Sequence, residues 1–180
     1  MDKWMYGRYE SVICISEETK ENLLRHLYGD KNIQTKKYKV IYNGINVAHY
    51  IPENQNVSAE AGKPPYIILM VSAFRWQKDQ KTVVRALSLL SDDYKVWFVG
   101  DGDSQLKGEC QLLAKSLSID EKIEFLGLRD DIPDLMHEAD VVVQSSFVDG
   151  FCLAAVEGMA SGTPVIVSDI PGVGDIVRGY

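Results

Sequence analysis

Short apolar runs alternate with longer amphipathic segments from residue 66 to the end of the chain, and polar, glycine-containing loops separate them. The runs at residues 66–71, 96–99, 122–125, 141–144 and 164–167 predict strands, and the segments at 80–90, 104–117, 132–139 and 151–161 predict helices. A further helix is expected after Pro171. Regular alternation of apolar strands and helices is typical of an α/β fold with a doubly wound parallel sheet.

The first 49 residues follow a different pattern. Residues 2–10 predict a short amphipathic helix that packs on another part of the molecule, and residues 12–15 predict a buried strand. Ser16 is a candidate N-cap for a helix that ends near Gly29, and a second strand is expected at 39–42. Residues 50–65 are polar and rich in breakers, which predicts a linker between an N-terminal part at 1–49 and a domain at 66–180.

Composition narrows the function classes. Apolar residues make up 46% of the chain, enough for a core, and the net charge of −7 with scattered Lys and Arg argues against a nucleic-acid partner. We see no apolar run of spanning length and no signal peptide. The odd cysteine number indicates reduced thiols in a cytoplasmic protein, and the three histidines form no ligand cluster, so no metal is expected.

Residues 141–167 form the most informative segment. A valine run ends at Ser145, and a helix follows Asp149 and Gly150. This helix is apolar or small on every side and is therefore expected to be buried, yet it carries one ionisable side chain, Glu157. Glu157 is either satisfied by structural partners or faces a cleft and accepts hydrogen bonds from ligand hydroxyls. Asp149 is either an N-cap or, beside a helix N-terminus that binds anions, a ligand contact. If both Asp149 and Glu157 contact a ligand, they lie on either side of an anionic ligand that bears hydroxyls.

The spacing of these residues resembles the donor-sugar signature of retaining glycosyltransferases of the GT-B fold, especially glycosyltransferase family 4. The signature runs from Asp149 through Gly150-Phe151 to Glu157 and on to a Gly-x-Pro-Val turn at 162–165. The resemblance implies a Rossmann-like sheet, one half of a GT-B fold. It also implies that Asp149 contacts the donor sugar and Glu157 the ribose. The backbone amides expected at the diphosphate are those of Gly150, Phe151, Cys152 and Leu153.

Two residues of this segment, Asp149 and Cys152, each have two possible roles. The family's first acid is usually Glu, and the shorter Asp149 implies a shifted sugar preference or a contact through water. Cys152 is either a packing residue or a nucleophile, and a nucleophile would need an activating base that the sequence does not show.

A basic pair stands in the loop after the first strand of the sheet. Arg75 and Lys78 precede a helix N-terminus, where cations are unfavourable, so they form either a solvated turn or a diphosphate site. The resemblance aligns Lys78 with the family's lysine for the donor diphosphate. The family's arginine position holds Ala73, so Arg75 is a substitute for that arginine.

Two further loops lie at the same sheet edge. Gly100 and Gly102 form a glycine-rich turn that the family places near the donor, although any tight turn can use it. Gln105 stands where a dinucleotide fingerprint needs glycine, which argues against an NAD enzyme. The resemblance implies that Leu128 and Arg129 line the nucleobase pocket with Ile132 over the ring; the alternative is a plain turn with Arg129 solvated or paired to Asp130 or Asp131.

The resemblance therefore implies transfer of a sugar, with retention, from a UDP-sugar or GDP-sugar to an acceptor hydroxyl. Arg75, Lys78 and Asp149 are the expected catalytic residues, with the leaving phosphate in place of a protein base and without cofactor or metal. The acceptor, a glycan or glycolipid of polysaccharide or glycolipid synthesis, is expected on the N-terminal half of the fold, of which residues 1–49 are expected to be a remnant next to the hinge. Any peripheral membrane association belongs to the full-length protein.

By the same resemblance, the chain is expected to be truncated at both ends and inactive alone. Two alternatives stay open: a GT-B sugar-nucleotide epimerase, which needs additional acid and base residues facing the donor, and a non-catalytic Rossmann-like binding domain.

Overall fold

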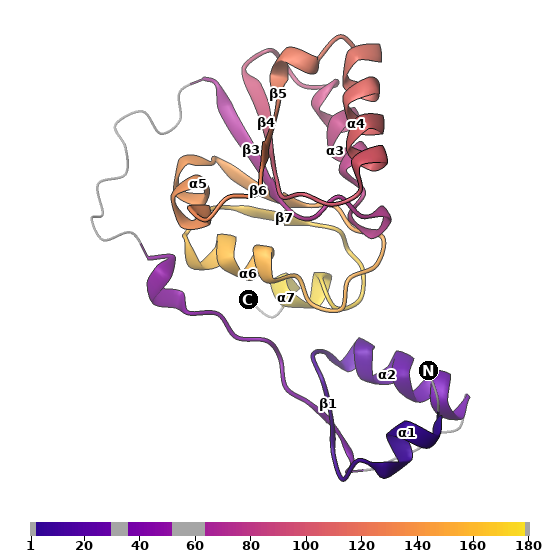
Figure 1. Cartoon of the computed structure of the whole chain (residues 1–180). Coiled ribbons are helices and arrows are strands. Elements are labelled where there is room, and N and C mark those ends of the chain that lie inside the picture. The colour runs from indigo at the N-terminus through magenta and orange to yellow at the C-terminus, as the bar shows by residue number, and fades with distance from the viewer. Residues whose placement is uncertain (1–2, 30–35, 52–63, 179–180) are drawn as a thin grey trace.

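The computed structural model describes residues 3–29, 36–51 and 64–178 and contains a five-stranded parallel sheet (Figure 1). Every pair of neighbouring strands in this sheet is parallel, in the order β5-β4-β3-β6-β7. The expected doubly wound α/β sheet is confirmed. The strands are β3 (Tyr66–Val71), β4 (Tyr94–Val99), β5 (Ile123–Gly127), β6 (Val141–Gln144) and β7 (Val165–Val167).

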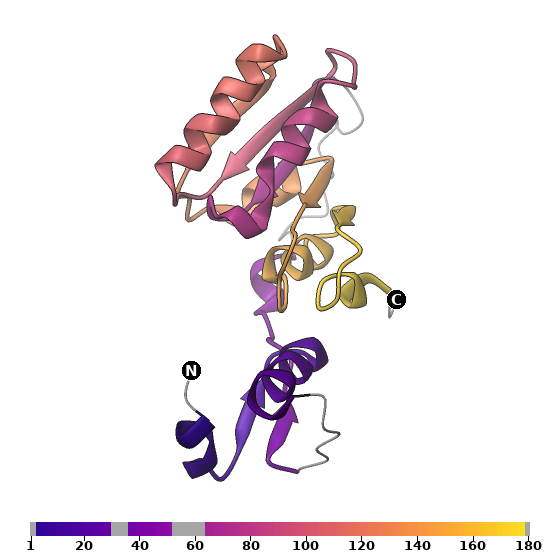
Figure 2. The ribbon, with the colours of Figure 1, turned by 90° about the vertical axis from the view of Figure 1, so that its right-hand side faces the viewer.

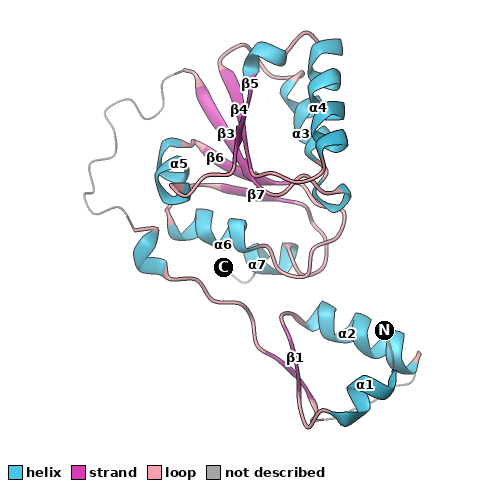
Figure 3. Cartoon of the chain, in the orientation of Figure 1, coloured by secondary structure: helices cyan, strands magenta, loops and turns pink. Residues whose placement is uncertain are grey.

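Helices cover both faces of the sheet (Figures 1 and 3). Helices α3 (Gln80–Leu87) and α4 (Ser104–Ser116) lie on one face. Helices α5 (Ile132–Glu138), α6 (Leu153–Ala160) and α7 (Gly174–Arg178) lie on the other. Within the described ranges, 3₁₀ turns occur at Val47–His49, Trp76–Lys78 and Asp120–Lys122.

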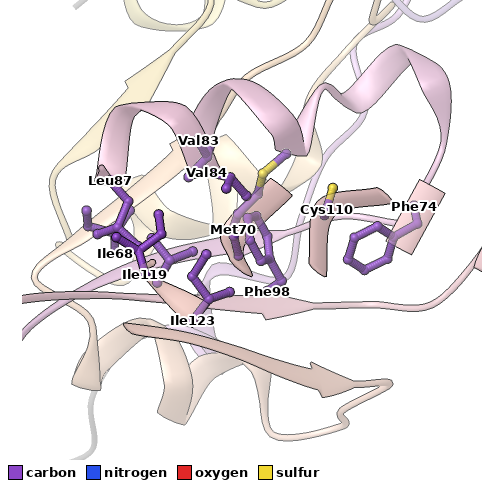
Figure 4. Packing of buried hydrophobic residues seen from close by; sticks show 12 residues of the cluster. Ile68, Met70, Phe74, Val83, Val84, Leu87, Phe98, Cys110, Ile119 and Ile123 are labelled. Atoms are coloured by element: carbon purple, nitrogen blue, oxygen red, sulfur yellow. The ribbon is translucent and has the colours of Figure 1, made fainter. Parts of the chain in front are cut away.

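The central strand β3 divides two apolar clusters, one under each layer of helices. Four successive residues of β3 are buried, because alternate side chains point to opposite faces and helices cover both. Met70 and Phe98 belong to the cluster under α3 and α4 (Figure 4), and Leu69 and Val142 to the cluster beneath α5.

Helix α6 approaches the sheet closely because it carries glycine at the contact. A Cβ atom on Gly158 would lie 3.1 Å from methyl carbons of Val142 and Val165. The helix is nevertheless only partly buried, with Leu153 40% exposed, so the expectation of a helix buried on every side is wrong.

The N-terminal elements form a separate two-stranded parallel sheet with two helices, away from the larger sheet (Figure 2). They are α1 (Lys3–Arg8), β1 (Val12–Cys14), α2 (Glu17–Tyr28) and β2 (Tyr38–Val40). Ser16 caps α2 as expected, accepting a hydrogen bond from the Thr19 amide at 3.1 Å.

Two expectations about the N-terminal part are wrong. Of the β1 residues only Cys14 is buried, because a two-stranded sheet leaves most of each strand uncovered. Trp4 on α1 is 66% exposed and lies under the Arg8 guanidinium at 3.6 Å rather than in a packed interface.

Most of the expected linker at 50–65 lies outside the described residues, and the domain boundaries stay a prediction. Across the described residues, no helix combines the length and apolar character needed to cross a membrane.

Candidate functional site

The candidate site lies at the carboxyl ends of the strands. There the connections from the two central strands, β3 and β6, lead to opposite sides of the sheet. From β3 the chain proceeds outward through β4 to β5, and it then returns to β6 on the other side of β3. At such a switch point, the loops that follow the two central strands diverge and leave room for a ligand. The loops that follow β3 and β6 carry Lys78 and Asp149, respectively.

Lys78 and Asp149 form an ion pair across this switch point. The Lys78 Nζ donates to the Asp149 carboxylate at 2.5 Å, and the two side chains are 23% and 14% exposed. Two further hydrogen bonds fix the same loops: the Phe147 amide donates to the Gln77 carbonyl at 2.8 Å, and the Ser145 hydroxyl donates to the Asp79 carbonyl at 2.9 Å. The structure therefore brings together two of the three expected catalytic side chains.

The start of α6 differs from the expectation. The helix begins at Leu153, Cys152 occupies the N-cap position, and Asp149 is not the cap. One Asp149 oxygen instead accepts from the Phe151 amide at 3.4 Å while the other meets Lys78. Gly150 lies beside the N-terminal part, because a Cβ there would be 2.8 Å from the Thr19 hydroxyl.

Cys152 is a packing residue in this arrangement. Burial raises the pKa of its thiol, the nearby Asp149 carboxylate acts in the same direction, and its side chain belongs to the cluster with Ala155 and Val173. A neutral, buried thiol is a poor nucleophile, so the structure favours the packing alternative.

Glu157 is half-buried on α6, and its carboxylate acts on the pKa of the Tyr50 phenol. Burial and this carboxylate raise the pKa of Tyr50 to about 12, so the phenol stays protonated near neutral pH. Sequence reasoning missed Tyr50 because it placed this residue in the linker. The one available signal was an aromatic residue at the start of a polar run.

The two glycines of the turn after β4 are explained by backbone contact. Gly100 has φ +129°, and a Cβ there would lie 2.3 Å from the Ser72 carbonyl oxygen. Gly102 has φ +148°, and its Cβ would lie 2.6 Å from the Phe74 carbonyl oxygen. Both positions need glycine for conformation and space, and the turn holds the loop after β3 in place.

The remaining expected residues lie around the site. Arg75 is exposed, and within the described ranges it makes no ion pair with a carboxylate. Leu128 is 79% exposed. Arg129 forms a two-pronged ion pair with Asp131, with Nε donating to Oδ1 at 2.7 Å, which was one of the alternatives for this side chain. Nucleobase contact by Leu128 and Arg129 stays a prediction.

The part of the chain that the structure describes contains no group of three or more His, Cys, Asp or Glu side chains placed to hold a metal ion.

The fold and the charged pair define an α/β domain with a candidate ligand site at the carboxyl edge of a parallel sheet. The chain belongs to the family Glycosyl transferases group 1, whose sequence pattern matches residues 51–180. Glycosyltransferase MJ1607 of Methanocaldococcus jannaschii, which is uncharacterised, is 32% identical over 94% of this chain and 45% of its own. The Escherichia coli UDP-Gal:alpha-D-GlcNAc-diphosphoundecaprenol alpha-1,3-galactosyltransferase is 27% identical over 93% and 44%. The chain thus spans a little under half the length of these relatives.

Solved GT-B glycosyltransferases share the fold. Anabaena Alr3699/HepE in complex with UDP and glucose superposes with a TM-score of 0.79 at 24% identity, over 91% of this chain and 45% of that protein. A glycosyltransferase from Rickettsia africae gives a TM-score of 0.79 at 25% identity, over 98% and 50%. The expected half of a GT-B fold is therefore confirmed.

Proposed function

We propose that this chain is the donor-binding part of a retaining glycosyltransferase, which transfers a sugar from a nucleoside diphosphate sugar to an acceptor hydroxyl. The observation that carries the proposal is the Lys78–Asp149 ion pair at the switch point of the sheet. A lysine and a carboxylate held side by side can serve the two halves of such a donor. The ammonium suits the diphosphate, and the carboxylate suits the sugar hydroxyls.

The remaining roles follow from position. Arg75 is exposed and free to swing toward the diphosphate beside Lys78, where both cations would stabilise the charge that develops on the leaving group. The amides of residues 150–153 precede α6 and suit phosphate oxygens. Glu157 would accept hydrogen bonds from the ribose, and the leaving phosphate would assist the acceptor in place of a protein base. No metal or other cofactor takes part in this proposal.

The comparisons support UDP as the first nucleotide to test, because HepE binds UDP and the E. coli relative is named as a UDP-Gal enzyme. GDP-sugars stay in the proposal as an alternative donor. A cytoplasmic enzyme of polysaccharide or glycolipid synthesis fits the E. coli relative, whose named acceptor is a diphosphoundecaprenol lipid. We expect the chain alone to bind donor weakly and to transfer no sugar, because the acceptor is assigned to a part of the protein outside it.

The experiment is a thermal-shift and calorimetric titration with UDP, GDP, ADP and NAD. At a concentration of ~100 times Kd, one nucleoside diphosphate should stabilise the protein by about 2.7 kcal/mol, a shift of several degrees in Tm. Glu157→Ala should lose most of this shift, and Glu124→Ala, an exposed carboxylate on the edge strand β5, should keep it. A flat response to all four nucleotides would contradict the proposal.

A further inference from the structure

The first turn of α2, in the N-terminal part, packs on the loop that carries Asp149. A Cβ atom at Gly150 would lie 2.8 Å from the Thr19 Oγ1 and 3.5 Å from the Ile15 Cδ1. The backbone at Gly150 does not have the positive φ that favours glycine, so alanine would meet no backbone strain there. The Thr19 hydroxyl is therefore the obstacle that reserves this position for glycine.

Two further contacts join the N-terminal part to the same region. A Cβ atom at Gly172 would lie 2.8 Å from the Glu18 Oε2 and 2.8 Å from the carbonyl oxygens of residues 149 and 150. The Glu18 carboxylate and the loop backbone thus approach Gly172 together. The ring of Tyr42, which follows β2, lies against Phe151 with the ring centroids 6.0 Å apart. The loop is therefore contacted by α2 and by the segment after β2.

The Thr19 side chain is held in place from within α2. Its hydroxyl is hydrogen-bonded to the Ser16 hydroxyl at 2.9 Å, and its amide donates to the same oxygen at 3.1 Å. Ser16 is buried, and a β-branched threonine has few rotamers in a helix. Thr19 cannot turn away from Gly150 without losing the hydrogen bond to Ser16, so it is a rigid support for the loop.

We infer that Thr19 is a positioning residue, which fixes the loop at residues 149–151 and thereby aims the amides of residues 150–153 at the donor diphosphate. The inference rests on the proposed function, in which these amides meet the diphosphate. A preorganised set of amide donors binds phosphate oxygens at a lower entropic cost than a loop that is free to move. Thr19 lies outside the matched family range of 51–180, so the N-terminal part contributes to donor binding through this contact.

The test compares the affinities for UDP and UMP by calorimetry. The ratio of the two measures the contribution of the β-phosphate, because both nucleotides share the base, the ribose and the α-phosphate. Hydrogen bonds to a charged group correspond to at least about a tenfold preference for UDP in the wild type. In Gly150→Ala we expect this preference to fall to about twofold or less, because the added methyl group pushes the loop away from Thr19.

A second substitution should reverse this loss. Thr19→Ala removes the hydroxyl that the new methyl group meets, so the double variant should regain a preference within about twofold of the wild type. Thr19→Ala alone should lower the preference to about fivefold, since the loop loses a support, and Thr19→Ser, which keeps the hydroxyl, should leave it unchanged. The pair of Thr19 variants decides the question even if Gly150→Ala does not fold.

Gly44→Ala is the matched control. Gly44 also lies in the N-terminal part, and a Cβ atom there would have no neighbour within 4 Å. This variant should keep the wild-type preference for UDP. Circular dichroism of each variant confirms that the calorimetry is done on folded protein.

The outcomes separate the two proposals. A double variant with no recovery, or a Thr19→Ala protein with the wild-type preference, overturns the role of Thr19 while donor binding stands. Equal affinities for UDP and UMP in the wild type likewise overturn it, because the amides then do not meet the diphosphate. If the wild type binds neither nucleotide, the proposed function fails and the positioning role fails with it.

Discussion

The Lys78 ammonium has two competing partners in the proposed function: the Asp149 carboxylate and the donor diphosphate. In the structure it meets Asp149 at 2.5 Å in a partly buried setting. Lys78→Met should weaken UDP binding by about 10- to 100-fold, since a hydrogen bond between charged groups is lost. Asp149→Asn should strengthen binding of UDP without sugar by about threefold to tenfold, because the competing negative charge is removed. Calorimetric titration of both variants measures these changes.

Lys81→Met is the control for this pair of variants. Lys81 is also a partly exposed lysine in an ion pair, with Glu109 on α4, and its loss should leave UDP affinity unchanged. Weaker UDP binding in Asp149→Asn would argue that the carboxylate supports the diphosphate site instead of competing with the nucleotide there.

Substitution by alanine should have opposite effects on stability at two glycines near α4. Gly100 lies in a left-handed conformation with the Ser72 carbonyl in the way of a side chain, whereas Gly108 lies inside α4 with open space around it. Gly100→Ala should destabilise the fold by at least about 3 kcal/mol or prevent folding. Gly108→Ala should stabilise it by about 0.5–1 kcal/mol, since alanine is the better helix former. Urea unfolding followed by circular dichroism measures both, and a shift in the same direction would contradict the described turn.

The hydrophobic pattern was sufficient to predict most elements because the sheet is covered on both faces. The residue ranges 66–71 and 141–144 were predicted with the boundaries that the structure shows. The start of α6 was misplaced because Asp149 pairs with Lys78 from a distant loop, a contact that local capping rules do not contain. The same reason explains Tyr50, whose local surroundings predict a linker and whose ring packs on the cluster that contains Leu135 and Met136 of α5.

The distribution of buried side chains predicts that the two sheets differ in stability. Both extended apolar clusters belong to the five-stranded sheet and its helices, whereas the described residues of the N-terminal part bury only a few apolar side chains, among them Cys14, Leu27 and Tyr38. Amides of β3 and β4 should therefore exchange with solvent only through global unfolding. Amides of β1 and β2 should exchange at least about tenfold faster, through local opening of a sheet with three paired positions. Hydrogen exchange followed by mass spectrometry on the whole chain tests this, and equal protection in the two sheets would show that they unfold as one cooperative unit.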